Sequence, residues 1–371
     1  MSKFYKLILI VFSILNIVKA KFNKIKCANY FIIVNNNLKI LDKRSSNFFD
    51  LKTCNYSFNL IRTHKLDFKT LLKIFKIPNF FCFSIIKDLS FNKLNNKSLM
   101  YLISHIFVFL KIDRLLLIDD SREMKFFSYL SKKLNLFSLI YMHGRFSKDS
   151  IIHKKTKFDI FLVWSNFFKK QLLETNQFYK SENINVIGNP NFKKKIFLKK
   201  KRIIIKKCLI LDEDFISYND IKKYFFEISK TKSIKFFFKK KISRNIPKKI
   251  IFFLQKNKIQ IIDDFISIEK IISKYKIDSI VASTSTGLLD AIYYGVIPIK
   301  IFSRNKEKEN EFKVFLEYEI VYSAKNAKML TNQLHKKFSY KKRIKNKNTL
   351  WGNSFYNSKK VKLKIKKFII N

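Results

Sequence analysis

The chain has 371 residues, of which 47% are hydrophobic, 5 are glycine and 4 are proline. This composition excludes a disordered or collagen-like chain, and the length exceeds what one hydrophobic core usually serves, so we expect two domains. Lysine and arginine number 77 against 27 acidic residues, a formal charge of +50. Such an excess favours anionic partners, among them nucleic acid, acidic lipid surfaces and phosphorylated substrates.

The positive charge is spread along the chain, with its densest runs at 193–207 and 239–249. No zinc-finger spacing or RNP-type signature accompanies it, so we expect no nucleic-acid partner. A basic nucleic-acid-binding protein stays as the alternative from another class. The four cysteines form no CxxC pair and have no histidines at metal spacing. We therefore expect buried thiols in a reducing cytoplasm and no metal site.

Residues 1–25 are apolar and basic, and we expect them to form a helix. The apolar run 7–18 is too short for a confident membrane span, and lysines follow it at 19, 21, 24 and 26. This pattern favours a helix that lies on an anionic inner-membrane surface, and hence a cytoplasmic protein peripheral to the inner membrane. A cleaved signal peptide is the alternative, because 18–20 (Val-Lys-Ala) resembles a cleavage site.

Strand and helix patterns alternate across residues 26–195, which we interpret as the first domain. This alternation predicts a parallel, doubly wound sheet. Strands are expected at 30–34, 38–42, 114–118, 137–142, 160–164 and 184–187, and helices at 68–75, 99–110, 124–134 and 166–175.

A lysine-rich junction at 193–207 separates this part from a second alternation. We interpret 196–335 as a second domain of the same kind, and 336–371 as a basic segment that packs back on the first domain. Strands are expected at 208–211, 234–238, 259–262, 280–282 and 296–302, and helices at 218–229, 247–255, 268–275, 288–293 and 326–338.

A turn rich in hydroxyl groups joins the strand at 280–282 to the next helix. Open α/β sheets bind ligands at the carboxyl ends of their strands, and a helix N-terminus favours phosphate. A simple helix cap is the alternative, although one hydroxyl would suffice for capping. The residues predicted to hold phosphate are Ser283, Thr284, Ser285, Thr286 and Gly287.

Four segments in chain order resemble a known enzyme architecture. They are HGRFS (143–147), FDIFLVWSNFFKKQLLE (158–174), INVIGNPNF (184–192) and VASTSTGLLDAIYYGVIPI (281–299). Together they resemble bacterial capsule and lipopolysaccharide glycosyltransferases of the GT-B type, and they are similar to CDP-glycerol glycerophosphotransferases. The resemblance implies an α/β fold with two doubly wound, Rossmann-like domains that face a cleft. In this arrangement 26–195 would be the acceptor domain and 196–335 the domain that binds the nucleotide sugar.

The resemblance also implies roles for single residues. The turn at 283–287 would hold the donor phosphates, and Asp290 would lie near the ribose. His143 would act as the base or position the acceptor, since histidine accepts protons near neutral pH. A metal-independent reaction needs fixed cations at the leaving diphosphate, and the candidates are Arg145, Lys239 and Lys240.

The implied substrates are a nucleotide sugar and a lipid-linked or glycan acceptor, with no further cofactor. One departure concerns the segment after 234–238, which reads FKKKISRN where relatives carry a His-Pro element. Either lysine takes over that contact with the donor, or the chain is a divergent and weaker enzyme. A CMP-sialic-acid-type sialyltransferase, a nucleotide-sugar epimerase on the same fold and an inactive membrane scaffold are the alternatives.

Overall fold

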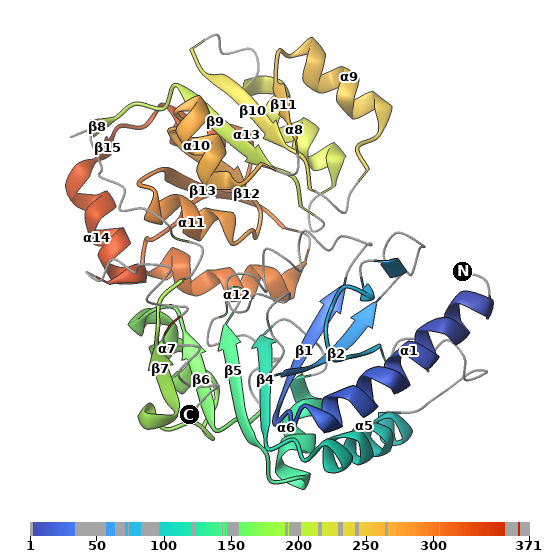
Figure 1. The fold of residues 1–371 in the computed structure, drawn as a ribbon. Coiled ribbons are helices and arrows are strands. Elements are labelled where there is room, and N and C mark those ends of the chain that lie inside the picture. The colour runs from blue at the N-terminus through green and yellow to red at the C-terminus, as the bar shows by residue number, and fades with distance from the viewer. Residues whose placement is uncertain are drawn as a thin grey trace.

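The structure is a computed structural model (Figure 1) built around two parallel sheets, one of seven strands and one of six. It describes residues 3–33, 57–63, 71–72, 74–82, 96–119, 124–142, 144, 146, 156–189, 192, 202–213, 217–228, 233–241, 245–263, 266–303, 305–352 and 363.

The first sheet has the strand order β3-β2-β1-β4-β5-β6-β7, and all of its strand pairs are parallel. Central strands such as β4 are almost entirely apolar, as expected where helices cover both faces of a parallel sheet. The strands are β1 (Cys27–Ile33), β2 (Ser57–Thr63), β3 (Phe80–Cys82), β4 (Arg114–Asp119), β5 (Phe137–Met142), β6 (Ile160–Val163) and β7 (Ile184–Val186), and the accompanying helices are α1 (Lys3–Phe22), α5 (Asn96–Leu110), α6 (Met124–Lys133) and α7 (Asn166–Thr175).

The second sheet has the order β11-β10-β9-β12-β13-β14 and is also parallel throughout. Its strands are β9 (Lys207–Leu211), β10 (Lys235–Lys239), β11 (Gln260–Ile262), β12 (Ser279–Ala282), β13 (Ile297–Ile301) and β14 (Tyr322–Ala324). Its helices are α8 (Tyr218–Ile228), α9 (Lys248–Lys256), α10 (Ile268–Tyr275), α11 (Gly287–Tyr293), α12 (Lys306–Glu317) and α13 (Ala327–His335).

The predicted α/β class with two doubly wound sheets is confirmed, and the bounds of β5, α7 and α10 match the predicted ranges. The predicted helix 326–338 is wrong at its carboxyl end, which lies earlier in the chain. The helix α13 stops at His335, and Phe338 pairs with Ile203 in a short antiparallel ladder between β15 (Phe338–Ser339) and β8 (Arg202–Ile203). The strand predicted at 38–42 lies outside the described residues.

The sequence analysis missed β2 because buried polar residues interrupt its apolar pattern. The Asn29 amide on β1 donates to the Ser57 hydroxyl at 2.8 Å, and the Asn59 amide on β2 donates to the carbonyl of Pro78 at 2.8 Å. Asn29, Ser57 and Asn59 are all buried. Such groups are tolerated in a core because each finds a hydrogen-bond partner.

The helix α14 (Tyr340–Trp351) links the first domain to the second (Figure 1). It contacts α7 of the first domain and α11 of the second. The Ser165 hydroxyl, just before α7, donates to the carbonyl of Leu350 at 2.5 Å, and the Trp351 indole N–H donates to the carbonyl of Leu289 on α11 at 3.3 Å. The helix α14 thus contacts elements of both domains.

Aromatic side chains from both domains surround Trp351. Phe192, which follows the first sheet, stacks on Tyr293 of α11 with ring centroids 3.6 Å apart. Trp351 lies 4.8 Å from Phe192 and 5.8 Å from Trp164, measured between ring centroids. Trp164 is a core residue, as predicted, and its indole N–H donates to the Tyr141 hydroxyl at 2.7 Å.

Within the described residues, every helix is too short or too polar to cross a bilayer.

Replacing Trp351 by alanine is expected to lower the free energy of unfolding by roughly 3–5 kcal/mol, because it leaves a cavity between the two domains. Urea unfolding monitored by circular dichroism measures the change. The control is Phe252→Ala on α9, whose ring is 67% exposed. Equal losses in the two variants would contradict the role assigned to Trp351.

Candidate functional site

The candidate site lies at the carboxyl edge of the second sheet, where the strand order reverses. The chain passes from β9 to β10 and β11 on one side, then crosses to β12 on the other side of β9. The switch point therefore falls between β9 and β12, which is where open α/β sheets bind their ligands. Asp212 and Glu213 follow β9 here, and the predicted hydroxyl turn follows β12.

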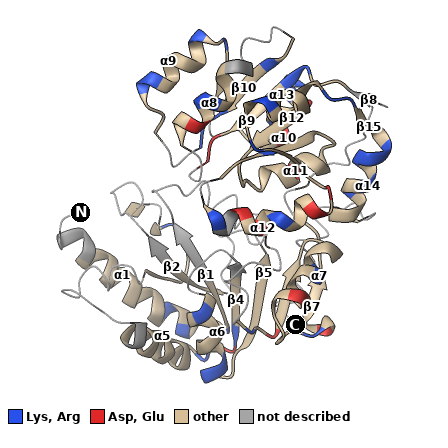
Figure 2. Ribbon diagram, turned by 180° about the vertical axis from the view of Figure 1, so that it is seen from behind, with Lys and Arg blue, Asp and Glu red and all other residues tan. Residues whose placement is uncertain are grey.

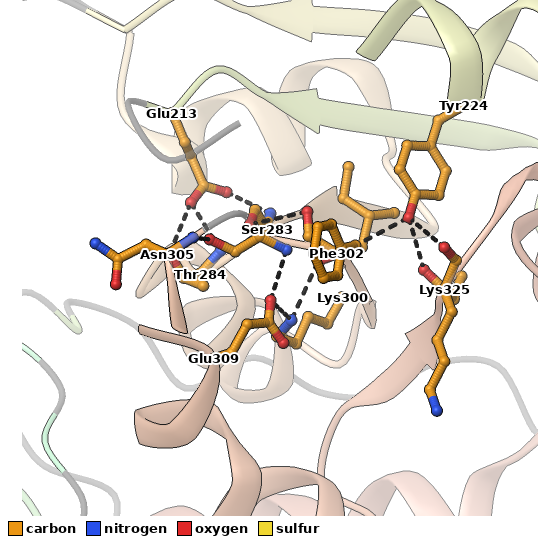
Figure 3. A network of polar contacts seen from close by, with 12 residues as sticks. Glu213, Tyr224, Ser283, Thr284, Lys300, Phe302, Asn305, Glu309 and Lys325 are labelled. Carbon is orange, nitrogen blue, oxygen red and sulfur yellow. Dashed lines mark hydrogen bonds and ion pairs between the residues drawn. The ribbon is translucent and has the colours of Figure 1, made fainter. Parts of the chain in front are cut away.

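The Glu213 carboxylate bridges this switch point (Figure 3). One of its oxygens accepts the backbone N–H of Ser283 at 2.5 Å, and the other accepts the N–H of Thr284 at 2.8 Å. The Thr284 hydroxyl lies 3.4 Å from the second oxygen. All three residues are buried. Charge-assisted bonds of this kind are stronger than neutral ones, so the carboxylate holds the turn firmly in place.

This contact divides the predicted phosphate-binding turn into two parts. The amides of Ser283 and Thr284 are occupied by a carboxylate from the protein itself. Ser285 and Thr286 are half-buried and lie nearer to solvent. The Ser285 hydroxyl accepts the Gly287 N–H at 3.1 Å, whereas the Thr286 side chain makes no capping bond to α11. Thr286 is thus the hydroxyl of this turn best placed for a ligand.

Gly287 packs closely against side chains of the second domain. A Cβ at this position would lie 2.6 Å from Cδ1 of Leu211 and 2.8 Å from Cδ1 of Ile268. A larger residue here would displace the ends of these two side chains. Gly295 follows α11 with φ +70°, a left-handed conformation that favours glycine: its N–H donates to the carbonyl of Ile292 and that of Val296 to the carbonyl of Ala291.

An ion pair between a buried lysine and a partly exposed glutamate lies beside the turn. The Lys300 ammonium on β13 lies 2.5 Å from a carboxylate oxygen of Glu309 on α12, and the same oxygen accepts the backbone N–H of Ser303 at 2.6 Å. Lys300 is only 3% exposed. A charge at this depth needs a partner, and the lysine within the otherwise apolar strand IPIKI was the sequence signal for it.

The Tyr224 hydroxyl contacts the backbone just after β13 and just after β14 (Figure 3). It donates toward the carbonyl of Lys325 at 2.8 Å and accepts the N–H of Phe302 at 3.3 Å. Burial raises the pKa of Tyr224 above its ordinary value, so the hydroxyl keeps its proton and serves as a donor at neutral pH. The sequence analysis missed Glu213, Tyr224, Lys300 and Glu309, because nothing in their spacing shows that they meet.

The remaining predicted residues fall into two groups. Lys239 and Lys240 are half-buried at the carboxyl end of β10, on the same edge of the sheet as Glu213. Asp290 is half-buried in the first turn of α11, where its N–H donates to the Thr286 carbonyl at 3.1 Å. His143 and Arg145 lie outside the described residues, as does Cys54. Cys27, Cys82 and Cys208 are buried thiols, as expected, and burial raises the pKa of Cys208 well above its usual value.

No group of three or more metal-ligating side chains occurs within the portion of the chain that the structure describes.

Solved structures of similar fold cover almost the whole chain. The UDP-GlcNAc 2-epimerase of Neisseria meningitidis bound to UDP-GlcNAc has a TM-score of 0.58 at 13% identity, over 94% of this chain and 100% of the other. MurG of Acinetobacter baumannii has a TM-score of 0.57 at 10% identity, over 92% and 99%. MnaA of S. aureus with UDP has a TM-score of 0.52 at 14% identity, over 90% of both chains.

These similarities establish the class of fold. The chain has the two-domain, Rossmann-like GT-B architecture predicted from its sequence. No protein-family model matches it, nor does any curated protein sequence.

Replacing Glu213 by alanine is expected to destabilise the protein, because it leaves the N–H groups of Ser283 and Thr284 buried without an acceptor. Each unpaired amide costs roughly 1–3 kcal/mol. Glu213→Gln retains one acceptor oxygen and should lose less. Chemical unfolding of both variants, compared with the exposed Glu317→Ala, measures the effect. A Glu213→Ala protein as stable as the Glu317 variant would show that the contact contributes nothing.

Proposed function

We propose that this protein is a glycosyltransferase that moves a sugar from a nucleotide-activated donor to a surface-glycan acceptor without a metal ion. The observation that carries the proposal is the hydroxyl turn at the β9–β12 switch point of a GT-B-type fold. Ligands of open α/β sheets bind at such points. The similar folds of MurG and of the UDP-bound structures support a nucleotide diphosphate as the ligand.

The donor diphosphate binds at the outer half of the turn, on Ser285 and Thr286. Glu213 holds Ser283 and Thr284 from the inner side and so fixes the backbone that carries these two hydroxyls. Lys239 and Lys240 supply positive charge from the neighbouring strand end. Asp290, one helical turn further on, accepts a ribose hydroxyl.

His143 and Arg145 complete the proposed reaction from the first domain. The acceptor hydroxyl attacks the anomeric carbon of the sugar and gives its proton to the His143 imidazole. The new glycosidic bond forms while the bond from the anomeric carbon to the diphosphate oxygen breaks. The nucleoside diphosphate leaves with the negative charge, which Arg145 and the lysines stabilise.

A nucleotide-sugar epimerase is the second candidate. The epimerase of N. meningitidis resembles this chain as closely in fold as MurG does, with TM-scores of 0.58 and 0.57. An epimerase needs no acceptor. Incubating the protein with UDP-GlcNAc and related UDP-sugars alone, followed by chromatography of the sugars, separates the two activities: a changed donor without acceptor favours the epimerase.

A thermal-shift panel of nucleotide sugars tests the proposal, because a ligand that binds only the folded state raises its melting temperature. We expect a concentration-dependent rise with one donor class, UDP-linked or CMP-linked, and sugar transfer once an acceptor is added. A CMP-linked donor would identify the sialyltransferase alternative. No shift with any donor, together with DNA binding that falls steeply with salt, would instead favour a nucleic-acid-binding protein.

Replacing Thr286 by valine removes the hydroxyl and keeps the shape of the side chain. We expect about tenfold weaker donor binding, the worth of one hydrogen bond to a charged group, at unchanged stability. Isothermal titration calorimetry measures the affinity. Thr331→Val on α13 is the control, because its hydroxyl bonds only within its own helix among the contacts described. Unchanged donor affinity in the Thr286 variant would remove this turn from the site.

A further inference from the structure

The amino-terminal helix α1 presents an apolar face to solvent. The exposed large side chains recur at helical spacing and so share one face: Leu7, Val11, Ile14, Leu15, Val18 and Phe22, with Phe12 beside them. Leu7 is 59% exposed, Leu15 is 57% exposed and Phe22 is 80% exposed. A helix on the surface of a globular domain normally exposes polar residues to water, whereas α1 exposes apolar ones.

The face of α1 that packs on the protein combines apolar and small side chains. Leu9, Ser13 and Ala20 are its fully buried residues, and Ile10 and Ile17 are partly buried against the same core. The Ser13 hydroxyl accepts the backbone N–H of Cys82 on the edge strand β3 at 3.4 Å. The helix α1 thus carries apolar side chains both toward the first sheet and toward solvent.

The neighbouring helix α5 extends this apolar face. It packs beside α1 (Figure 1), and its outward residues Tyr101 and Val108 are each 64% exposed, with Phe109 between the two helices. The Lys21 ammonium lies 4.8 Å from the centre of the Phe109 ring and donates to the Phe109 carbonyl, so the two helices are joined at this point. Contiguous exposed apolar surface of this kind marks an interaction site.

The charges around this surface are mostly positive. Residues 1–41 and 96–112 contain no aspartate or glutamate. Lysines gather where α1 ends, at 19, 21, 24 and 26, and Lys111 follows α5. One acidic residue, Asp113, lies beside them and pairs with Lys26 at 4.0 Å and with Arg114 at 3.7 Å. Figure 2 shows lysine and arginine spread over both domains.

We propose that α1 and α5 form a docking surface for an anionic phospholipid bilayer. The apolar side chains enter the headgroup region while the lysines contact lipid phosphates, as in helices that lie in the plane of a membrane. The predominantly positive rim favours an anionic bilayer over a second copy of this chain, because two such surfaces would repel each other. This surface lies on the first domain and needs no nucleotide sugar, so its failure and that of the proposed function are distinguishable.

Co-sedimentation of the full chain with vesicles tests the proposal. Wild-type protein is expected to bind vesicles of phosphatidylglycerol and phosphatidylethanolamine, and to bind phosphatidylcholine vesicles at least tenfold more weakly. The double variant Val11→Asp, Leu15→Asp should lose binding to both. Phe252→Asp on α9, an exposed aromatic of the second domain, should bind as the wild type does.

A second set of variants tests the contribution of the lysine charges to vesicle binding. Lys19→Gln with Lys24→Gln should weaken binding to anionic vesicles by on the order of tenfold. Lys248→Gln with Lys256→Gln on α9 changes the net charge equally and should have little effect. Circular dichroism shows whether each variant keeps its fold.

Two results would overturn the proposal. One is wild-type protein that stays in the supernatant with anionic vesicles. The other is the absence of vesicle binding together with a wild-type dimer in light scattering. If the double variant at Val11 and Leu15 were then a monomer, the surface would be assigned to a second copy of the chain.

Discussion

The contact between Glu213 and the amides of Ser283 and Thr284 fixes the candidate site. It joins the carboxyl ends of β9 and β12 at the point where the strand order of the second sheet reverses. The backbone there would otherwise carry buried donors without acceptors, which is costly. The inner half of the turn is therefore structural, and its outer half can be presented to a ligand without backbone reorganisation.

The same edge of the sheet is braced by further polar contacts. Lys300 and Glu309 connect β13 to α12, and Tyr224 connects α8 to the ends of β13 and β14. Lys300 and Tyr224 are buried and Glu309 is partly exposed, and their contacts position the loops at this edge. The aromatic residues around Trp351 perform the corresponding task between the domains, through Phe192 and Tyr293. A transferase that joins a donor and an acceptor from two domains needs this kind of fixed arrangement.

The sequence predicted those parts of the fold that depend on local pattern. Apolar strands such as β5 and amphipathic helices such as α10 follow from periodicity alone. The strand β2 does not follow from periodicity, because asparagine is typical of loops. Only the tertiary contact with β1 shows why Asn59 is buried in a strand. Likewise the hydroxyl turn was visible in the sequence. That Glu213, seventy residues earlier, occupies the backbone amide of Ser283 depends on tertiary contacts. Gly287 was visible in the same way, but its packing against Leu211 and Ile268 depends on the tertiary fold.

The account centres on nucleotide binding by the turn at 283–287. Hydrogen–deuterium exchange in the presence of saturating UDP or CMP tests it most directly, because it reports on single segments without requiring the acceptor. The account predicts slower exchange at Ser285, Thr286 and the start of α11 with one of the two nucleotides, while the amides of Ser283 and Thr284 are already protected in its absence. Protection confined to other segments, or no protection with either nucleotide, would contradict it.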